Sequence, residues 1–200
     1  MLQVIDLDFD YQEQPLLSGI NFTVPSGGLL HLQGANGAGK TTLLKVLAGL
    51  YQPSLGHICY LGQPIQQQLH YYQRHLCFIG HKAGINPYLT LRENCLFDVH
   101  YNQSSCDVAA LASIFKLAAY LDTPCGLLSA GQKRQVGLLR LWFSAATLWL
   151  LDEPFVALDN KTLELLMNKM QLHREQGGAI VLTSHQHLPL ESSAYQDYFL

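Results

Sequence analysis

The chain is poor in charged residues and has no dense run of lysine and arginine. Only 14% of its 200 residues are charged, against roughly 25% in an average globular protein. The formal net charge is −3 with neutral histidines. A clustered basic face is the usual footprint of a nucleic-acid-binding protein, so we expect no nucleic acid among the partners. The low charge fits either a well-filled core or a surface that is kept for a protein partner.

Cysteine pairs and long apolar runs are also lacking. The five cysteines form an odd set without any C-x-x-C spacing, which argues against a disulfide framework or a zinc site and favours a reducing compartment. The most apolar stretch, residues 138–151, is interrupted by Arg140, Ser144 and Thr147, so it is not a membrane span. The first residues lack the apolar centre of a secretory signal. We therefore expect membrane contact through partners only.

Short β-type segments open the chain and then alternate with helical segments. Turn residues 25–28 separate the β-rich start from an apolar strand at 28–33. Further strands are predicted at 57–62, 75–80, 148–152 and 179–184. A helix follows the glycine-rich turn after residue 33, with its apolar face formed by Leu43, Val46, Leu47 and Leu50, and an amphipathic helix covers 163–170.

The middle of the chain, at about 85–130, reads as a helical subdomain. Thr90 and Glu93 have the spacing of a capping box at one of its helix starts. Strands that alternate with helices indicate an α/β fold with a mainly parallel sheet. We predict one domain over residues 1–200, with an antiparallel β part at the N-terminus.

A phosphate-binding loop lies between the strand at 28–33 and the following helix. Residues 34–41 read GANGAGKT and match G-x-x-x-x-G-K-[ST] in full. Glycines let backbone N–H groups wrap phosphate oxygens, and the helix N-terminus adds positive potential. Lys40 is expected to reach the β- and γ-phosphates, while the Thr41 hydroxyl ligates Mg²⁺. The predicted ATP-binding residues here are Gly34, Ala35, Asn36, Gly37, Ala38, Gly39, Lys40, Thr41 and Thr42.

Two carboxylates, Asp152 and Glu153, stand at the end of the apolar strand predicted at 148–152. Such a pair is usually just a solvated strand end, but the phosphate loop upstream favours a catalytic interpretation. Asp152 would then hold Mg²⁺ through its water shell. Glu153 would act as the general base that polarises the attacking water. The sequence thus predicts a nucleoside triphosphatase, with Lys40 and Glu153 among its catalytic residues.

Residues 128–132, Leu-Ser-Ala-Gly-Gln, allow a structural and a functional interpretation. Ser129 and Gln132 have capping-box spacing at the start of a helix. The same helix N-terminus, with a serine hydroxyl and a glycine backbone, is also suited to bind a γ-phosphate. The two interpretations are compatible, because a cap that binds phosphate is still a cap.

With these motifs in order, the whole chain resembles the ABC ATPases, a family of P-loop NTPases. The resemblance implies a homodimer in which the signature, Leu128, Ser129, Ala130, Gly131 and Gln132, acts on the nucleotide of the partner copy. It also implies a D-loop at Asp159, a catalytic switch histidine at His185 and an adenine-stacking Tyr11. Two departures stand out: Ala130 replaces a usual glycine, and His81 replaces a usual glutamine. Imidazole is a poor Mg²⁺ ligand, so His81 is expected to hold a water or to couple the nucleotide to the helical part.

Several segments together are similar to the haem-exporter ATPases of cytochrome c biogenesis. They are residues 79–85, 128–132, 146–150, 152–155, 175–178 and 182–186. The similarity implies inner-membrane transporter subunits as partners, a haem chaperone as an indirect partner, and a peripheral position on the cytoplasmic face of a bacterial inner membrane. ATP would drive haem export or release of the loaded chaperone. Nine scattered histidines do not by themselves indicate haem binding.

Other ABC ATPases remain as alternatives. A DNA-repair type would carry a coiled-coil or zinc insertion between the phosphate loop and the signature, and this chain has neither heptads nor C-x-x-C there. A translation-type protein would need two tandem ATPase domains. An exporter subunit for another substrate is the alternative that the sequence leaves open.

Overall fold

The computed structural model describes residues 1–12, 14–185, 188, 190 and 194–200, which form two compact units. The first unit comprises Met1–Phe78, Ala146–Pro154 and Gln171–Leu200. The second comprises Ile79–Ala145 and Phe155–Met170, so the helical range expected at 85–130 lies inside it.

The first unit begins with an antiparallel sheet. Its strand order is β2 (Gln14–Val24), β1 (Leu2–Tyr11), β4 (Leu55–Tyr60) and β5 (Gln63–Pro64). Alternate residues of β1 are buried, because successive side chains of a strand point to opposite faces. Register shifts interrupt the pairing of β1 with both neighbours, which is how this long strand bends.

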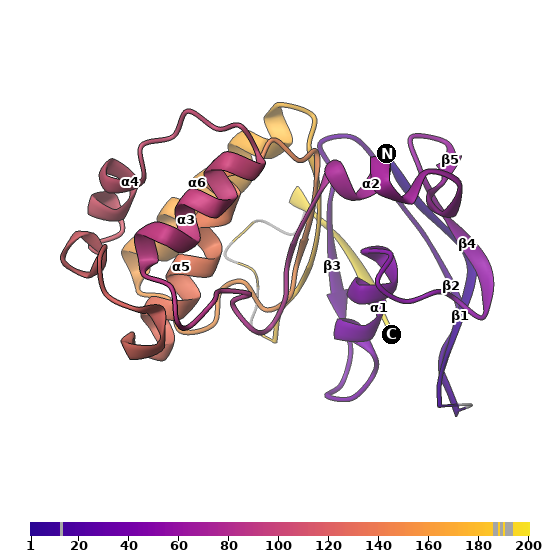
Figure 1. The fold of residues 1–200 in the computed structure, drawn as a ribbon. Helices are drawn as coiled ribbons and strands as arrows, with labels where there is room; N and C mark the ends of the chain where they lie inside the picture. The colour runs from indigo at the N-terminus through magenta and orange to yellow at the C-terminus, as the bar shows by residue number, and fades with distance from the viewer. Residues whose placement is uncertain (13, 186–187, 189, 191–193) are drawn as a thin grey trace. The chain divides into compact units, whose positions relative to one another are not determined.

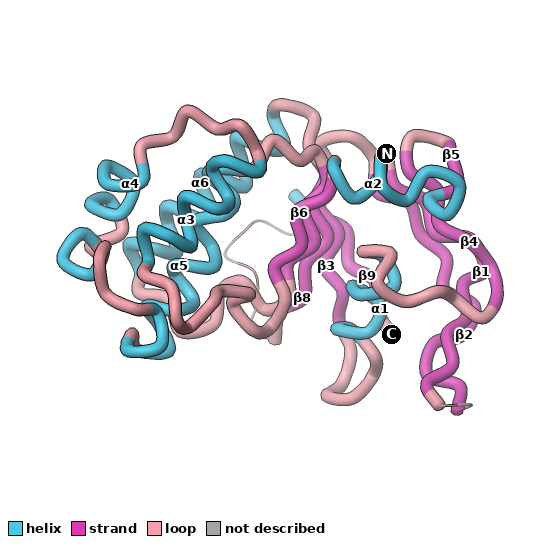
Figure 2. The backbone as a smooth tube through the Cα atoms, in the orientation of Figure 1, coloured by secondary structure: helices cyan, strands magenta, loops and turns pink. Residues whose placement is uncertain are grey.

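The second sheet of this unit carries the chemistry predicted from the sequence. Its order is β6 (Leu76–Ile79), β7 (Leu148–Leu151), β8 (Ala179–Thr183), β3 (Leu29–Gln33) and β9 (Gln196–Phe199) (Figures 1 and 2). Strand β3 pairs parallel with β8 and β9, and β7 pairs parallel with β8. Every residue of β7 and β8 is buried, as in parallel sheets that are covered on both faces.

Short helices accompany these sheets. Helix α1 (Lys40–Leu47) follows β3, and the 3-10 turn η1 (Ile65–Gln68) leads into α2 (Leu69–Arg74). Leu43, Val46 and Leu47 are buried as predicted, but Leu50 is not part of this face. The helix ends at Leu47 and a left-handed Gly49 turns the chain away, so the Leu50 side chain is 56% exposed.

The second unit is helical. It contains α3 (Leu91–Tyr101), α4 (Val108–Ile114), η2 (Ala118–Tyr120), η3 (Cys125–Leu127), α5 (Ala130–Phe143) and the first part of α6 (Asn160–Glu175). Helices α3 and α5 lie side by side (Figure 1). Together with α4 they form a separate core that includes Leu91, Val108, Leu111, Phe115, Leu139 and Phe143.

Side-chain caps define where these helices begin. The predicted capping box is present in α3, where Thr90 Oγ1 accepts from the Glu93 N–H and Glu93 accepts from the Thr90 N–H. The backbone N–H and the hydroxyl of Thr90 both donate to the Glu93 carboxylate and lower its pKa. Asp107 caps α4 through the N–H groups of Ala109 and Ala110. Among the described residues, no helix is long and apolar enough to cross a membrane.

Candidate functional site

Three glycines determine the backbone conformation of the phosphate loop. Gly34, Gly37 and Gly39 have φ of 147°, 85° and 97°, values that residues with a Cβ rarely adopt. Gly39 is the left-handed N-cap residue of α1, and a Cβ there would lie 2.8 Å from the Leu17 Cδ2. The loop therefore turns from β3 into the N-terminus of α1, where backbone N–H groups and the helix dipole favour an anion.

Lys40 lies over the carbonyl side of this loop. Its Nζ donates to the carbonyl oxygens of Gly34 at 2.7 Å and Ala35 at 3.1 Å, and the residue is only 8% exposed. The ammonium is thus held within the loop by weak neutral acceptors. Phosphate oxygens are stronger, charged acceptors, so a bound nucleotide is able to take over these donors.

Asp152 joins the phosphate loop to the end of the sheet. The Thr41 Oγ1 donates to its Oδ2 at 2.8 Å, and the Thr183 Oγ1 donates to its Oδ1 at 2.8 Å. Asp152 is 2% exposed, so these bonds hold a buried carboxylate. The sequence interpretation did not find Thr183, which sits beside Asp152 because Leu151 and Leu182 are paired in the β7–β8 register.

The oxygens of Thr41 and Asp152 fit Mg²⁺. Both are hard ligands, and Mg²⁺ typically binds one or two protein oxygens while substrate phosphates and water supply the rest. Within the described part of the chain, no group of three or more His, Cys, Asp or Glu side chains is placed to hold a metal by itself. The Thr41 hydroxyl and the Asp152 carboxylate are thus the residues that would hold Mg²⁺ beside a bound nucleotide.

Glu153 occupies a strained backbone position next to Asp152. Its φ is +52°, which is unusual for a residue with a Cβ and is often found at functional sites. Its N–H donates to Thr183 Oγ1 at 2.9 Å. The His185 N–H donates to Glu153 Oε2 at 3.3 Å, and His185 Nε2 lies 3.4 Å from Glu153 Oε1. The structure thus brings together Glu153 and His185, two of the residues that the sequence assigned to catalysis, from distant positions in the chain.

The signature segment begins helix α5 in the second unit. Ser129 is its N-cap, with Gln132 N–H donating to Ser129 Oγ at 3.2 Å and Ser129 N–H donating to Gln132 Oε1 at 2.8 Å. The capping interpretation is confirmed. Since Ser129 Oγ accepts this bond, its own O–H can still donate to an outside acceptor such as phosphate. Ser129 and Ala130 are exposed, and a Cβ on Gly131 would lie 3.2 Å from the Ala157 carbonyl oxygen.

Asp159, the predicted D-loop residue, caps helix α6. Its Oδ1 accepts from the Thr162 N–H at 2.8 Å. Hydrogen bonds from the side chain and the backbone of Thr162 lower the pKa of Asp159. Thr162 also accepts a hydrogen bond from Gln135 Nε2 at 2.8 Å, which ties α6 to α5 within the second unit.

Two arginines of α5 hold the segment that contains His81. Arg134 Nη1 donates to the Gly80 carbonyl at 2.8 Å, and Arg140 Nη2 donates to the Gly84 carbonyl at 3.2 Å. Arg140 Nε also contacts Asp98 Oδ1 of α3 at 3.1 Å. The helix that starts at the signature is therefore bonded to both ends of the segment 80–84.

Between these arginines, Gly137 brings the helix backbone against Ala83. A Cβ on Gly137 would lie 2.6 Å from the Ala83 carbonyl oxygen and 3.0 Å from the Ala83 Cβ. Residues 134, 137 and 140 are spaced three apart and so lie on one side of the helix. We call Arg134, Gly137 and Arg140 the α5 clasp. A glycine inside a helix, flanked by arginines at that spacing, was the signal in the sequence.

For Tyr11, His81 and Thr42 the structure gives the position in the fold, but their predicted roles are not tested. Tyr11 ends β1 and is 54% exposed, which leaves its ring accessible. His81 follows β6 and is also exposed. Thr42 lies in the first turn of α1. Stacking of adenine on Tyr11 stays a prediction, as does the role of His81.

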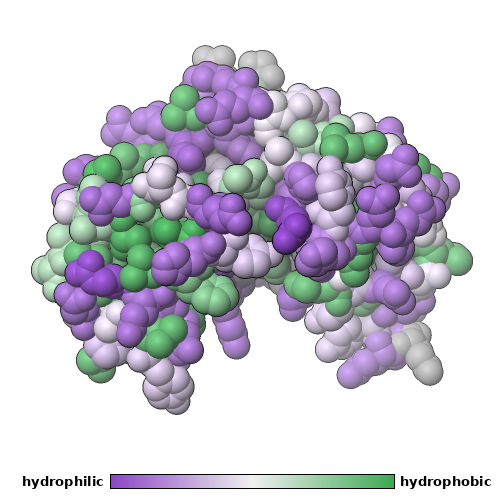
Figure 3. All heavy atoms as spheres, turned by 45° about the horizontal axis from the view of Figure 1, so that its top comes forward, coloured by the Kyte–Doolittle hydropathy of each residue, from purple (hydrophilic) through white to green (hydrophobic). Residues whose placement is uncertain are grey.

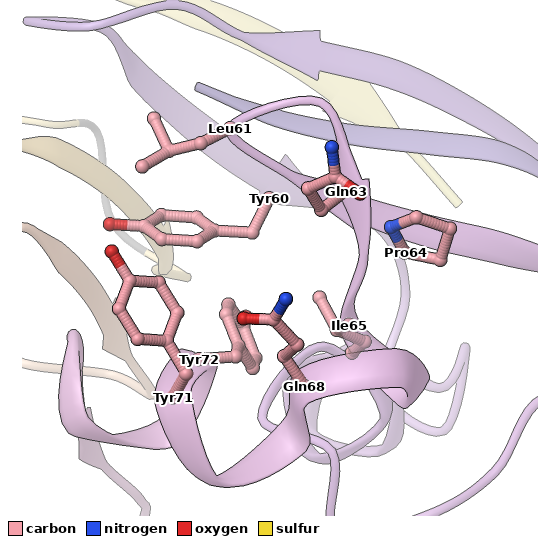
Figure 4. A pocket seen from close by; sticks show the side chains of 8 residues that line it. All are labelled: Tyr60, Leu61, Gln63, Pro64, Ile65, Gln68, Tyr71 and Tyr72. Carbon is pink, nitrogen blue, oxygen red and sulfur yellow. The ribbon is translucent and has the colours of Figure 1, made fainter.

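A separate pocket of about 230 Å³ lies in the first unit, away from the phosphate loop. Figure 4 shows the rings of Tyr60, Tyr71 and Tyr72 grouped on one side of it, opposite Pro64. Burial raises the pKa of Tyr60 and of Tyr72, so both phenols are neutral. Tyr60 OH is paired with Thr147 Oγ1 at 2.5 Å and Tyr72 OH with the Leu47 carbonyl at 2.6 Å. None of the lining residues carries a charge, so this pocket does not suit a triphosphate.

Fold, phosphate loop and carboxylate pair together define a P-loop ATPase of the ABC type. The sequence matches the ABC transporter family over residues 17–156, and the chain belongs to this family. It is 58% identical to the cytochrome c biogenesis ATP-binding export protein CcmA of Legionella pneumophila (strain Paris), over 100% of both chains. It is 44% identical to the protein of the same name from Escherichia coli O157:H7, over 96% of this chain and 93% of that protein.

Solved structures agree with this fold. An ATP-binding subunit of an ABC transporter has a TM-score of 0.83 and 28% identity, covering 92% of this chain and 79% of that one. A dimeric ATP-binding cassette in a post-hydrolysis state with ADP and phosphate has a TM-score of 0.80 and 22% identity, covering 93% and 88%. The expected α/β ABC fold and the expected ABC-type ATPase with ATP as its nucleotide are confirmed.

Proposed function

We propose that this chain is the ATP-hydrolysing subunit of an ABC export complex that serves cytochrome c biogenesis. The contact of Thr41 with Asp152 carries the catalytic part of this proposal, because it places the carboxylate pair at the phosphate loop. The full-length similarity to CcmA proteins supports the process that is served.

Each residue of the site has a defined task in hydrolysis. The loop amides and Lys40 bind the β- and γ-phosphates, and Thr41 and Asp152 would hold Mg²⁺, which neutralises charge on the phosphate oxygens. Glu153 accepts a proton from water as its oxygen attacks the γ-phosphorus, and the bond to the bridging oxygen breaks to give ADP and phosphate. His185 orients the Glu153 carboxylate through its N–H and its ring.

A homodimer would complete the site. Ser129 and the backbone at Ala130 and Gly131 are presented at the exposed start of α5, where a helix N-terminus attracts an anion. In the proposed dimer this segment binds the γ-phosphate on the partner copy, while Asp159 lies at the same interface. The dimeric cassette among the solved neighbours supports this arrangement as a fold-level precedent.

Membrane subunits of the cytochrome c maturation system are the proposed partners, reached from the cytoplasmic face of a bacterial inner membrane. The second unit exposes large apolar side chains, including Tyr88 at 90% and Phe97 at 70%, and Figure 3 shows apolar patches among polar ones on the face it draws. In this proposal the exposed side chains of Tyr88, Leu89 and Phe97 contact a helix of a membrane subunit. Leu91, the first residue of α3, is buried in the helical core and is not part of this surface.

The proposed cargo step is haem export or release of a loaded haem chaperone, with export of another substrate as the alternative. Deleting the gene should abolish covalent haem in c-type cytochromes, and the chain should co-purify with the haem-handling membrane proteins. Normal c-type cytochromes after deletion, with loss of export of a different compound, would support the alternative.

Glu153→Gln tests the catalytic assignment. The variant should bind ATP but barely hydrolyse it, and it should accumulate as a dimer with ATP in size-exclusion chromatography. Lys40→Ala is the matched control, because it should lose turnover through weaker phosphate binding and should not accumulate the dimer. Turnover at the wild-type rate in Glu153→Gln would remove Glu153 from the role of general base.

A further inference from the structure

A buried histidine lies in the middle of the strand that leads into the phosphate loop. His31 is 4% exposed and sits between Leu30 and Leu32 in β3, both fully buried. In the register of the sheet, His31 is opposite Leu182 of β8 and Asp197 of β9. A polar ring in this position needs partners, because burying an imidazole without hydrogen bonds is costly.

Both ring nitrogens of His31 meet oxygen acceptors. The Nδ1 lies 3.0 Å from Asp197 Oδ1, and the Nε2 lies 3.3 Å from the Ser184 carbonyl oxygen. The same Asp197 oxygen accepts from Gln33 Nε2, and the Tyr195 ring packs edge-on at 5.9 Å. Asp197 is the charged group that faces the ring among the described residues.

The Ser184 carbonyl connects this histidine to the candidate catalytic pair. Ser184 directly precedes His185, whose N–H donates to Glu153 Oε2 and whose ring nitrogen approaches Glu153 Oε1. The carbonyl of Ser184 and the N–H of His185 belong to the same peptide group, which is planar and moves as a unit. A bond at one side of this peptide therefore fixes the donor at its other side.

We propose that His31 is a positioning residue for hydrolysis: it holds the Ser184–His185 peptide against β3 and so aims the His185 N–H at the Glu153 carboxylate. Asp197 orients the His31 ring from the opposite side. This inference rests on the proposed roles of Glu153 and His185. It assigns His31 no contact with the nucleotide.

Replacing His31 by glutamine or by asparagine tests its two hydrogen bonds separately. The side-chain nitrogen of glutamine reaches about as far as a histidine Nε2, and that of asparagine about as far as Nδ1. His31→Gln should keep the bond to Ser184, and His31→Asn only the bond to Asp197. His31→Leu removes both. His57→Leu, at an exposed position of β4, is the control for loss of a histidine.

The measurements are kcat, the Kd of Mg-ATP and the melting temperature of the purified full-length chain. The Leu and Asn variants should lose about tenfold in kcat, as expected for loss of one hydrogen bond that positions the base. Their Kd for Mg-ATP should stay within about twofold, and His31→Gln should keep kcat within about twofold of wild type. Equal kcat for the Gln and Asn variants, or wild-type kcat in the Leu variant, would overturn the proposal. So would a kcat loss matched by the loss of ATP affinity.

A readout that does not depend on turnover distinguishes this inference from the proposed function. The backbone amide resonance of His185 in the ¹⁵N-labelled chain should shift in the Leu and Asn variants and stay near its wild-type position in the Gln variant. If it does so while Glu153→Gln turns over normally, the peptide contact stands and the catalytic assignment fails. An unchanged His185 amide in all three variants would refute the contact itself.

Discussion

Replacing Gly137 of the α5 clasp by alanine gives a prediction about stability. The test is whether the free energy of unfolding falls or rises. Gly137 lies inside helix α5, where replacing glycine by alanine normally stabilises a helix by roughly 1 kcal/mol. In this chain the added methyl group would lie 2.6 Å from the Ala83 carbonyl oxygen and 3.1 Å from the Ala83 Cα. These atoms are backbone, so they cannot move out of the way by a change of rotamer.

The two opposing effects allow the magnitude to be worked out. Overpacking a tight contact costs about 1–3 kcal/mol, and the gain in helix propensity offsets roughly 1 kcal/mol of this. We therefore expect Gly137→Ala to lower the free energy of unfolding by up to about 2 kcal/mol, where propensity alone predicts an increase. For a chain of this length, each kcal/mol corresponds to about 2–4 °C in melting temperature.

Thermal unfolding of the purified chain measures this sign directly. Amide hydrogen exchange in residues 80–84 then localises the effect, because the segment that carries His81 must move away from α5. Ala83→Gly in the same background removes the Cβ that lies 3.0 Å away and should restore part of the stability. Lys133→Gln is the control, since its bond runs from α5 to the Gly126 carbonyl outside that segment. A melting temperature that rises in Gly137→Ala, with unchanged exchange in 80–84, would refute the reasoning.

Three further predictions concern single positions. His81→Gln should keep much of the ATPase activity, because it restores the residue usual in the wider family. If His81 couples to a partner, the variant should still fail in cytochrome c assembly. Complete loss of hydrolysis would instead make His81 catalytic. Gly178→Ala should destabilise by about 1–3 kcal/mol, since the new Cβ would meet the His173 ring, and the cost should vanish in a His173→Ala background. Burial, with a smaller effect of Asp98, raises the pKa of Cys95 to about 12, so this thiol should resist iodoacetamide at pH 8, and rapid labelling seen by mass spectrometry would contradict that environment.

The parts of the site that local sequence encodes were predictable. The phosphate loop needs glycines at fixed positions, and the boxes at Thr90 and Ser129 need only residues three apart, so each leaves a readable pattern. The carboxylate pair was interpretable because the apolar strand before it could be recognised. None of these assignments required knowing how distant segments pair.

The parts that depend on register were not predictable. Thr183 bonds to both Asp152 and the Glu153 N–H, a consequence of which residues of β7 and β8 lie opposite each other. The role of His31 depends on β9, a four-residue strand whose mostly exposed residues carry no clear apolar alternation. A histidine inside a buried strand was visible in the sequence, but its two acceptors come from elements more than 150 positions away.

The structure also gives a packing explanation for two segments on which the similarity to haem-exporter ATPases was based. Residues 146–150 and 175–178 are far apart in sequence, but the Trp149 ring stacks on the His173 ring at 3.8 Å, with an interplanar angle of 10°. That histidine ring in turn lies so close to Gly178 that a Cβ there would be 2.2 Å from the His173 Nε2. Trp149, His173 and Gly178 therefore form one packing unit, in which the His173 ring lies against both other residues. Their joint occurrence is a constraint of packing in the first unit and says nothing about cargo. If the proposed export complex gains its specificity from surfaces that contact partners, substitutions of the exposed aromatic side chains Tyr88 and Phe97 of the second unit should alter cytochrome c assembly while leaving basal ATP hydrolysis intact.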